Sequence, residues 1–159
     1  MASRTIRRLL IRALRAPVVL YHWHLGWLLG QRFLRLTHRG RRSGRCYRTM
    51  LEVIGTDRIR KEVFVMVGLG RRAQWYRNVQ AGGAVEVAIG NERFRPAYRE
   101  LKPMEAVQAI GDYERRHRLL SPIVRAMLSA LIGWRYDGSL GARRRVVSER
   151  PIIALRSAS

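Results

Sequence analysis

The spacing of apolar residues changes along the chain, and it predicts helices first and strands afterwards. Within residues 3–15 the apolar positions recur at helical spacing on one face, and arginines fill the other positions. Pro17 suits the first turn of a second helix, which we expect to extend through residues 18–36. Residues 1–36 are therefore predicted to form a helical N-terminal segment.

From Tyr47 onward the pattern is typical of strands with short connections. The expected elements are strands over 47–54 and 62–67, a short helix over 73–81, strands over 84–89 and 93–101 joined as a hairpin, helices over 103–117 and 122–134, and a last strand over 146–155. Pro151 lacks an N–H group, so we expect the last strand at an edge or a bulge. The order predicts an α+β fold in which helices surround a barrel or a strongly twisted antiparallel sheet.

The composition is that of a single folded domain. The 159 residues, 47% of them hydrophobic, are enough for one packed core. Cys46 is the only cysteine, which excludes a disulfide within the chain and fits a reducing compartment. The four histidines are not joined by a cysteine cluster, so we expect no metal site.

The net charge of +21 is the most unusual property of the composition. Twelve arginines precede Glu52, whereas no acidic residue does. Such a charge suits nucleic acid, an anionic membrane surface, or a phosphorylated and carboxylated ligand. We rank nucleic acid last, because no recognition motif accompanies the charge.

The N-terminal segment allows two interpretations. Its charge-free part, residues 16–31, is shorter than the roughly 20 apolar residues of a membrane-spanning helix. Arginines combined with Trp23 and Trp27 suit the membrane interface instead. The alternative is that these helices pack on the rest of the domain, and the sequence leaves both open.

The densest chemical signal is a basic, glycine-rich turn followed by Arg48. Its residues are Gly40-Arg41-Arg42-Ser43-Gly44-Arg45. Glycines let a ligand approach the backbone, and arginines match the oxygens of phosphates and carboxylates. This turn (residues 40–45), called the basic turn below, is a candidate anion site, although a solvated surface turn has the same composition.

A second signal is the run Gly68-Leu69-Gly70 and the short helix after it. A glycine-rich strand end before a helix leaves backbone N–H groups free to meet a ligand. Trp75 and Tyr76 are adjacent, so they point in different directions on a helix. One of them could line a pocket while the other packs in the core, or both could be core aromatics.

Taken together, these segments resemble the deazaflavin-dependent nitroreductase family, a branch of the split β-barrel flavin and deazaflavin oxidoreductases. The resemblance is close from Leu36 to about Leu101 and extends to residues 112–117. It implies a split β-barrel (FMN-binding-like) over residues 37–159, with flanking helices, behind the N-terminal segment. The matching motifs are Thr37-His38-Arg39-Gly40-Arg41-Arg42-Ser43-Gly44, Arg48-Thr49-Met50-Leu51-Glu52-Val53, Trp75-Tyr76-Arg77-Asn78-Val79 and Ala81-Gly82-Gly83-Ala84-Val85-Glu86-Val87.

The resemblance implies coenzyme F420, a deazaflavin with a phosphodiester and an oligoglutamate tail, as the cofactor in preference to FMN. The implied phosphate and tail ligands are Arg41, Arg42, Ser43 and Gly44, with help from Arg48. The implied ring contacts are Thr49, Met50 and Leu51, and the site is closed by Val67, Gly68, Trp75, Tyr76 and Asn78. Tyr113 resembles a tyrosine near the substrate pocket of family members and could donate a proton, or it could be a packed helix aromatic.

The implied function is an F420-dependent oxidoreductase that transfers hydride to a hydrophobic acceptor, such as a quinone or a lipid. The alternative is a binding protein of the same fold that holds a fatty acid, a tetrapyrrole or the cofactor without turnover, since a fold does not fix a reaction. We expect a cytoplasmic protein, with peripheral attachment to the inner face of the cell membrane as one form of this prediction. A homodimer is also considered, because split barrels of this kind often dimerise.

Overall fold

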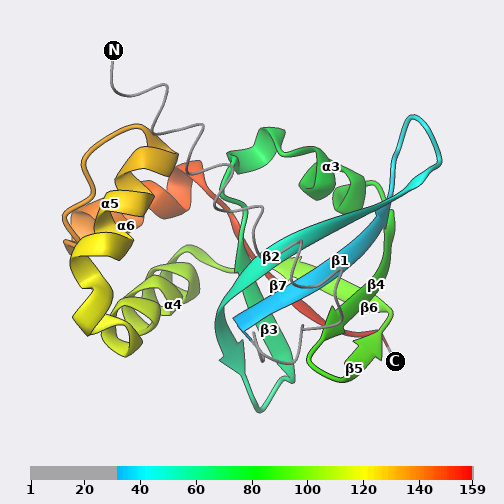
Figure 1. The fold of residues 1–159 in the computed structure, drawn as a ribbon, viewed down its shortest axis with the longest axis horizontal. Coiled ribbons are helices and arrows are strands. Elements are labelled where there is room, and N and C mark those ends of the chain that lie inside the picture. Colours follow the sequence, from blue (N-terminus) through cyan, green and yellow to red (C-terminus); the bar gives the residue numbers. More distant parts are fainter. Residues whose placement is uncertain (1–31, 159) are drawn as a thin grey trace.

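The computed structural model describes residues 32–158, and this part of the chain forms a curved, seven-stranded antiparallel sheet with helices around it (Figure 1). The sheet order is β5-β4-β1-β2-β3-β7-β6, and every neighbouring pair is antiparallel. The strands are β1 (Phe33–Arg39), β2 (Cys46–Asp57), β3 (Glu62–Met66), β4 (Ala84–Ile89), β5 (Glu92–Phe94), β6 (Pro96–Glu100) and β7 (Ile152–Ser157).

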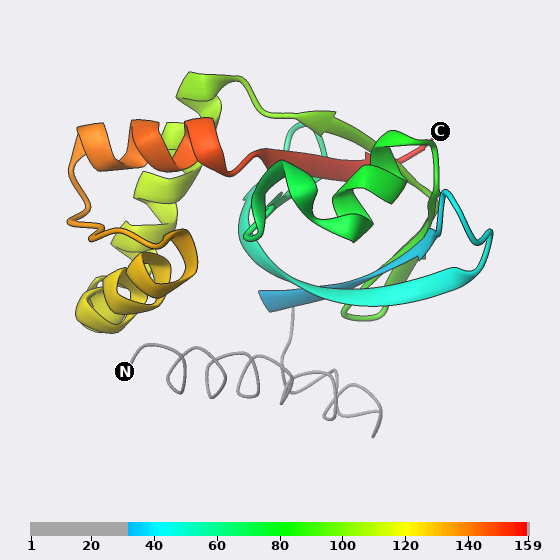
Figure 2. The same ribbon diagram turned by 90° about the horizontal axis from the view of Figure 1, so that it is seen from above.

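The two ends of this sheet come together. Strands β4 and β6 contact each other although they are not neighbours in the sheet. The backbone N–H of Ala158, after β7, donates to the carbonyl of Arg95, between β5 and β6, at 2.8 Å. The sheet therefore curls into a nearly closed barrel (Figure 2). This confirms the expected α+β split β-barrel with flanking helices.

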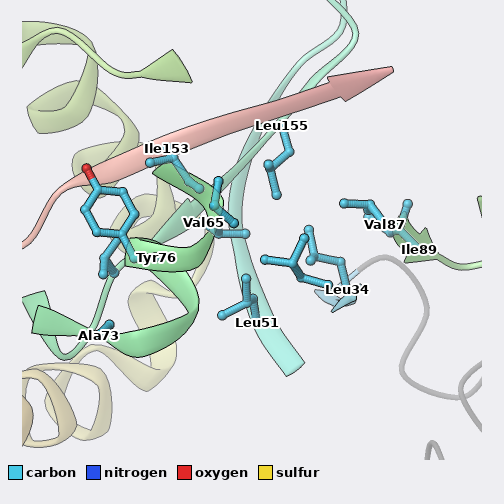
Figure 3. Packing of buried hydrophobic residues seen from close by; sticks show 12 residues of the cluster. Leu34, Leu51, Val65, Ala73, Tyr76, Val87, Ile89, Ile153 and Leu155 are labelled. Carbon is cyan, nitrogen blue, oxygen red and sulfur yellow. The ribbon is translucent and has the colours of Figure 1, made fainter. Parts of the chain in front are cut away.

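The barrel is filled by side chains that alternate along its strands. In β1, Leu34 and Leu36 are fully buried while their neighbours are partly exposed, as expected for a strand with one face on a core. Helix α3 (Gln74–Gln80), which follows the 3-10 turn η2 (Gly70–Arg72), adds Tyr76 to this core. Figure 3 shows Leu34, Val65 and Leu155 gathered in this core from different strands, with Tyr76 of α3 at its edge.

Three helices gather at one side of the barrel, whereas α3 lies over the barrel itself (Figure 1). They are α4 (Pro103–Arg116), α5 (Ser121–Ile132), which follows the 3-10 turn η3 (Arg118–Leu120), and α6 (Leu140–Glu149). A second core between them and the sheet contains Ile110, Tyr136 and Val146. Their bounds follow local signals, because Pro103 opens α4, Gly133 ends α5 with a φ of 85°, and Ser139 caps α6. None of the helices within residues 32–158 has the length and hydropathy that crossing a bilayer requires.

Several expectations need correction. Residues 33–36 were assigned to the N-terminal helical segment, but they open β1, so the expected domain boundary at 36/37 falls inside this strand. The rest of that segment, residues 1–31, lies outside the described residues. The strand expected over 93–101 is divided into β5 and β6 at Arg95.

The prediction for the last strand was wrong at its start and in its position. Residues 146–149 belong to α6, and β7 begins only at Ile152. Because Pro151 precedes the strand, every ladder N–H group of β7 is retained, and β7 pairs with both β3 and β6. The edge proline is instead Pro96, at the start of β6.

A charged network joins three elements across the outside of the barrel. Glu62, at the start of β3, is buried, and both its oxygens accept hydrogen bonds from Arg99 of β6 at 2.9 and 2.8 Å. Arg99 also donates to Glu105, in the first turn of α4, at 2.9 Å. The hydrogen bond from Arg99 is the main reason that the pKa of Glu105 falls to about 2.

We predict that Arg99→Ala destabilises the protein by about 3 kcal/mol, because it leaves the buried carboxylate of Glu62 without a partner. Arg60→Ala is the matched control, since Arg60 also pairs with Glu105 but is exposed, and its loss is expected to cost less than about 1 kcal/mol. Urea unfolding of both variants measures the difference. Equal losses of stability would contradict the importance assigned to Glu62.

Candidate cofactor-binding site

The basic turn connects β1 to β2, and its glycines are sterically required. Gly44 has a φ of 66°, in the left-handed region, and its N–H donates to the carbonyl of Gly40 at 2.8 Å. A Cβ on Gly40 would lie 2.6 Å from Oγ of Ser43 and 2.8 Å from the Tyr47 ring. Ser43 and Tyr47 are further joined through their hydroxyls at 3.0 Å. The turn is therefore compact, and the side chains of Arg42 and Arg45 are exposed on it.

Hydrogen bonds fix this turn to α3. The backbone N–H and the Nη1 group of Arg41 both donate to Oδ1 of Asn78, at 3.2 and 3.0 Å. The same Nη1 donates to Oε1 of Gln74 at 3.0 Å. The basic turn and residues 74–78, the two segments singled out in the sequence, therefore lie side by side. Helix α3 lies beside the base of the β1–β2 hairpin (Figure 1).

The link from α3 to β4 also packs closely against β1. The N–H of Arg39 donates to the carbonyl of Gly83 at 2.7 Å, and the N–H of Gly83 donates to the carbonyl of Asn78 at 2.8 Å. A Cβ on Gly83 would lie 2.6 Å from the Arg39 carbonyl and 2.7 Å from the Asn78 carbonyl. Only glycine fits here without moving the backbone that carries the site.

A chain of buried polar groups runs beneath the basic turn. Nδ2 of Asn78 lies 3.1 Å from Nδ1 of His38, and Nε2 of His38 lies 3.1 Å from Oγ1 of Thr49. Burial lowers the pKa of His38, so its imidazole is neutral at pH 7. His38 was not among the residues expected at the site. The period-two burial of Leu34, Leu36 and His38 is the signal that places it inside the barrel.

The charge around the basic turn is not neutralised within the described residues. Arg41, Arg42, Arg45, Arg48 and Arg77 form no ion pair there, whereas Arg35 nearby pairs with Glu86. Desolvation, followed by the positive charges of Arg77 and Arg42, lowers the pKa of Arg41. The first 51 residues contain no acid that could compensate. An anionic ligand would relieve this repulsion, so the donors present fit a group that carries a phosphodiester and carboxylates.

The three expected ring-lining residues do not share one face of β2. Register places Thr49 opposite Leu36 and Leu51 opposite Leu34, on the inner face of the barrel. Met50 lies opposite Arg35 on the outer face. Leu51 is buried in the barrel core, so it could reach a ligand only through its backbone, whereas Thr49 and Met50 are both partly exposed.

The glycine run after β3 is packed and hydrogen-bonded within the protein, whereas the sequence suggested that its N–H groups would be free for a ligand. The N–H groups of Gly68 and Gly70 donate to the carbonyls of Met66 and Val67 at 3.0 and 2.7 Å. A Cβ on Gly68 would lie 3.1 Å from Leu131 of α5, and Val67 is fully buried. The expected free N–H groups at these two glycines are therefore already used.

Of the two adjacent aromatics, Tyr76 is the core residue. It is fully buried and donates to Glu100 at 2.9 Å, and burial, reinforced by Glu100, raises the pKa of Tyr76 to about 12. Trp75 is partly exposed and meets Tyr76 edge to face, with ring centroids 6.0 Å apart. Of the pair, Trp75 is the one that keeps a surface for a ligand.

Tyr113 connects α4 to β2. Its hydroxyl donates to Oε1 of Glu52 at 2.6 Å, and its ring lies 4.6 Å from the ring of His117. Burial, with Glu52 as a second cause, raises the pKa of Tyr113, so the phenol keeps its proton at neutral pH. Glu52 follows Met50 on the outer face of β2, which places Tyr113 along the same strand as the expected ring contacts.

A hollow of about 450 Å³ lies at the other end of β2. Its lining includes Arg60, Glu62 and Arg99, which are paired with carboxylates or arginines of the charged network described above. Two of its four cations, Arg60 and Arg99, are thus paired with carboxylates, whereas the arginines of the basic turn form no ion pair within residues 32–158. Within residues 32–158 no group of three or more His, Cys, Asp or Glu side chains is arranged to hold a metal ion.

Residues 18–124 match the model of the F420H(2)-dependent quinone reductase family. The chain belongs to this family. It is accordingly an oxidoreductase, and its cofactor is coenzyme F420. The match confirms the resemblance to F420-dependent split-barrel enzymes that the motifs indicated.

No curated protein matches the chain. Among solved structures, the chain is similar to an F420-H2-dependent reductase (FDR-A), with 17% identity, 80% of this chain and 96% of that one covered, and a TM-score of 0.46. A protein of unknown function from Agrobacterium tumefaciens has 14% identity, coverages of 93% and 55%, and a TM-score of 0.46. A pyridoxamine 5'-phosphate oxidase-related, FMN-binding protein from Nostoc punctiforme has 16% identity, coverages of 88% and 78%, and a TM-score of 0.44. The family assignment therefore rests on the sequence match.

We predict that Gly83→Ala costs at least about 2 kcal/mol of stability, because its Cβ meets two carbonyl oxygens. Gly82→Ala is the matched control. Gly82 has a φ of 76° and open space around it, so alanine there should cost only about 1 kcal/mol. Thermal or urea unfolding compares the two variants. A Gly83 variant as stable as the Gly82 variant would show that the link between α3 and β1 is loose.

We also predict that stability falls with acid through His38. Its folded-state pKa is lowered, so below about pH 6.5 the unfolded chain takes up a proton that the folded protein resists. The free energy of unfolding should therefore decrease from about pH 7 to about pH 5 more steeply in wild type than in His38→Gln. Gln can accept from Asn78 and donate to Thr49 without titrating. If the free energy of unfolding of wild type and of His38→Gln changed with pH in the same way, this prediction would be wrong.

Proposed function

We propose that this F420-dependent oxidoreductase transfers hydride to a hydrophobic acceptor, such as a quinone or a lipid, and that it holds its cofactor at the basic turn. The observation that carries the proposal is the cluster of unneutralised arginines on a turn that is fixed to α3. A phosphodiester with several carboxylates is the kind of ligand that such a cluster recognises.

The anionic part of the cofactor is assigned to Arg41, Arg42, Ser43, Gly44 and Arg48. The guanidinium of Arg41 is oriented by Gln74 and Asn78, and its other N–H groups remain for a ligand. Arg42 and Arg48 are exposed and carry their full charge to the surface. The rigid turn supplies Ser43 and the backbone of Gly44 at little cost in conformational entropy.

The ring is assigned to the start of β2 and the neighbouring part of α3. Side chains of Thr49, Met50 and Trp75 are the accessible ones. The other residues of this set contribute through backbone or by shaping the wall behind the accessible side chains. They are the partly exposed Gly68 and the buried Leu51, Val67, Tyr76 and Asn78. Asn78 in particular holds the basic turn in place.

When bound, reduced F420 supplies the hydride, and the protein supplies binding, orientation and exclusion of water. The apolar interior of the barrel excludes water from one side of the site. Tyr113 holds its proton toward Glu52, which makes the Tyr113–Glu52 pair the candidate source of a hydrogen bond or a proton for the acceptor.

Two features support a hydrophobic acceptor near a membrane. The family name specifies quinone reduction. In addition, large apolar side chains are exposed on and beside α5, namely Leu119, Leu120, Ile123, Met127 and Leu131. The proposal also includes a cytoplasmic location, peripheral attachment to the inner face of the cell membrane, and a homodimer.

We predict that F420 binds about a hundredfold or more tightly than FMN, because FMN lacks the glutamate tail. The preference should shrink at high salt and with a cofactor trimmed of its glutamates. Arg42→Ala should weaken F420 binding about tenfold, whereas Arg58→Ala, an exposed arginine in the β2–β3 link, should leave it unchanged. Fluorescence titration of the full-length protein measures these affinities.

Tighter binding of FMN, or equal effects of the two arginine variants, would contradict the assignment of the basic turn. Adding a short-chain quinone to the complex with reduced F420 then tests turnover. Oxidation of the cofactor supports the reductase, while tight binding without oxidation would support the binding-only alternative.

A further inference from the structure

The hydrogen bonds beneath the basic turn have a defined direction, and Arg41 sets it. Oδ1 of Asn78 faces two groups of Arg41 that can only donate, the backbone N–H at 3.2 Å and Nη1 at 3.0 Å. The amide oxygen of Asn78 must therefore face Arg41, and its NH2 group must face His38. The choice between the two orientations of the Asn78 amide is fixed by its partners.

The direction continues through His38. Nδ1 of His38 lies 3.1 Å from the NH2 group of Asn78, so it has to accept and carries no proton. A neutral imidazole then has its proton on Nε2, which lies 3.1 Å from Oγ1 of Thr49. His38 therefore donates to Thr49, and burial favours this neutral form.

Thr49 is left with a hydroxyl proton that needs an acceptor. Within residues 32–158 its Oγ1 makes a side-chain hydrogen bond to His38 alone. Along the inner face of β2 exposure falls from Tyr47, which is exposed, through Thr49, which is half-buried, to Leu51, which is buried. Thr49 thus lies where the barrel opens toward the basic turn.

We propose that His38 is a positioning residue that fixes the Thr49 hydroxyl as a hydrogen-bond donor to the bound cofactor, an inference that rests on the proposed function. The ligand atom at this position is then an acceptor, a ring carbonyl oxygen or a phosphate oxygen, and a donor there is disfavoured. Arg41 acts on the same contact from a distance, because it sets the orientation of Asn78.

The protonation of His38 can be read without any cofactor. Nitrogen NMR of the full-length protein should show His38 as the neutral form protonated on Nε2, with the signal assigned by its loss in His38→Gln. A proton on Nδ1, or a charged imidazolium at neutral pH, would overturn the proposal.

The ligand contact is tested by titration with F420. Thr49→Val keeps the shape of the side chain and removes the donor, so affinity should fall about tenfold, whereas Thr49→Ser keeps the donor and should lose much less affinity than Thr49→Val. His38→Gln can accept from Asn78 and donate to Thr49, so it should lose much less affinity than His38→Leu. His38→Leu should lose about as much as Thr49→Val, and the double variant should lose no more than either single variant.

Wild-type affinity in Thr49→Val would overturn the proposal, and this variant decides the matter even when His38→Leu does not fold. Additive losses in the double variant would show that His38 acts independently of Thr49. Failure of the wild-type protein to bind F420 would overturn the proposed function and the ligand contact with it, and the NMR spectrum would then report on the hydrogen-bond direction alone.

Discussion

The structure of the site depends on the carboxamide of Asn78, which joins α3 to β1 and to the basic turn that follows β1, about forty residues earlier in the chain. Its oxygen accepts from Arg41 in the basic turn, its nitrogen faces His38 in β1, and its own helix packs on the barrel through Tyr76 and Val79. Because all these groups are buried or half-buried, each hydrogen bond left unmade would cost the desolvation of its partner. A turn that carries several like charges is thereby held in one conformation before any ligand arrives.

The site also requires backbone segments to pack closely together, and two glycines make this possible. Gly40 lets Ser43 and Tyr47 fold back over the basic turn, while Gly83 lets the end of α3 lie against Arg39. The backbone of the turn is closely packed, and the side chain of Arg41 is held by Gln74 and Asn78. Charge attracts the ligand, and the steric fit of the turn orients it.

The sequence predicted the elements whose signals are local. Pro103 indicated the start of α4, and the adjacent pair Gly82-Gly83 indicated the end of α3. Strand β1 was missed because Phe33 and Leu34 continue an apolar stretch that also suits a helix, and only pairing with β2 and β4 decides between the two. Residues 146–149 were assigned to a strand because Val146 and Val147 favour one, whereas packing on the second core makes them helical. Among site residues, the basic turn was visible as a motif, but the burial of Leu51 and Val67 and the part played by His38 depend on tertiary contacts.

We propose that the cofactor binds at the unneutralised basic turn and not in the hollow beside Arg60 and Glu62. A crystal structure of the full-length protein with F420 tests this most directly. We expect the phosphodiester against Arg41 and Arg42, and the ring beside Thr49. Cofactor density in the hollow at the far end of β2, with the basic turn left in solvent, would contradict this assignment.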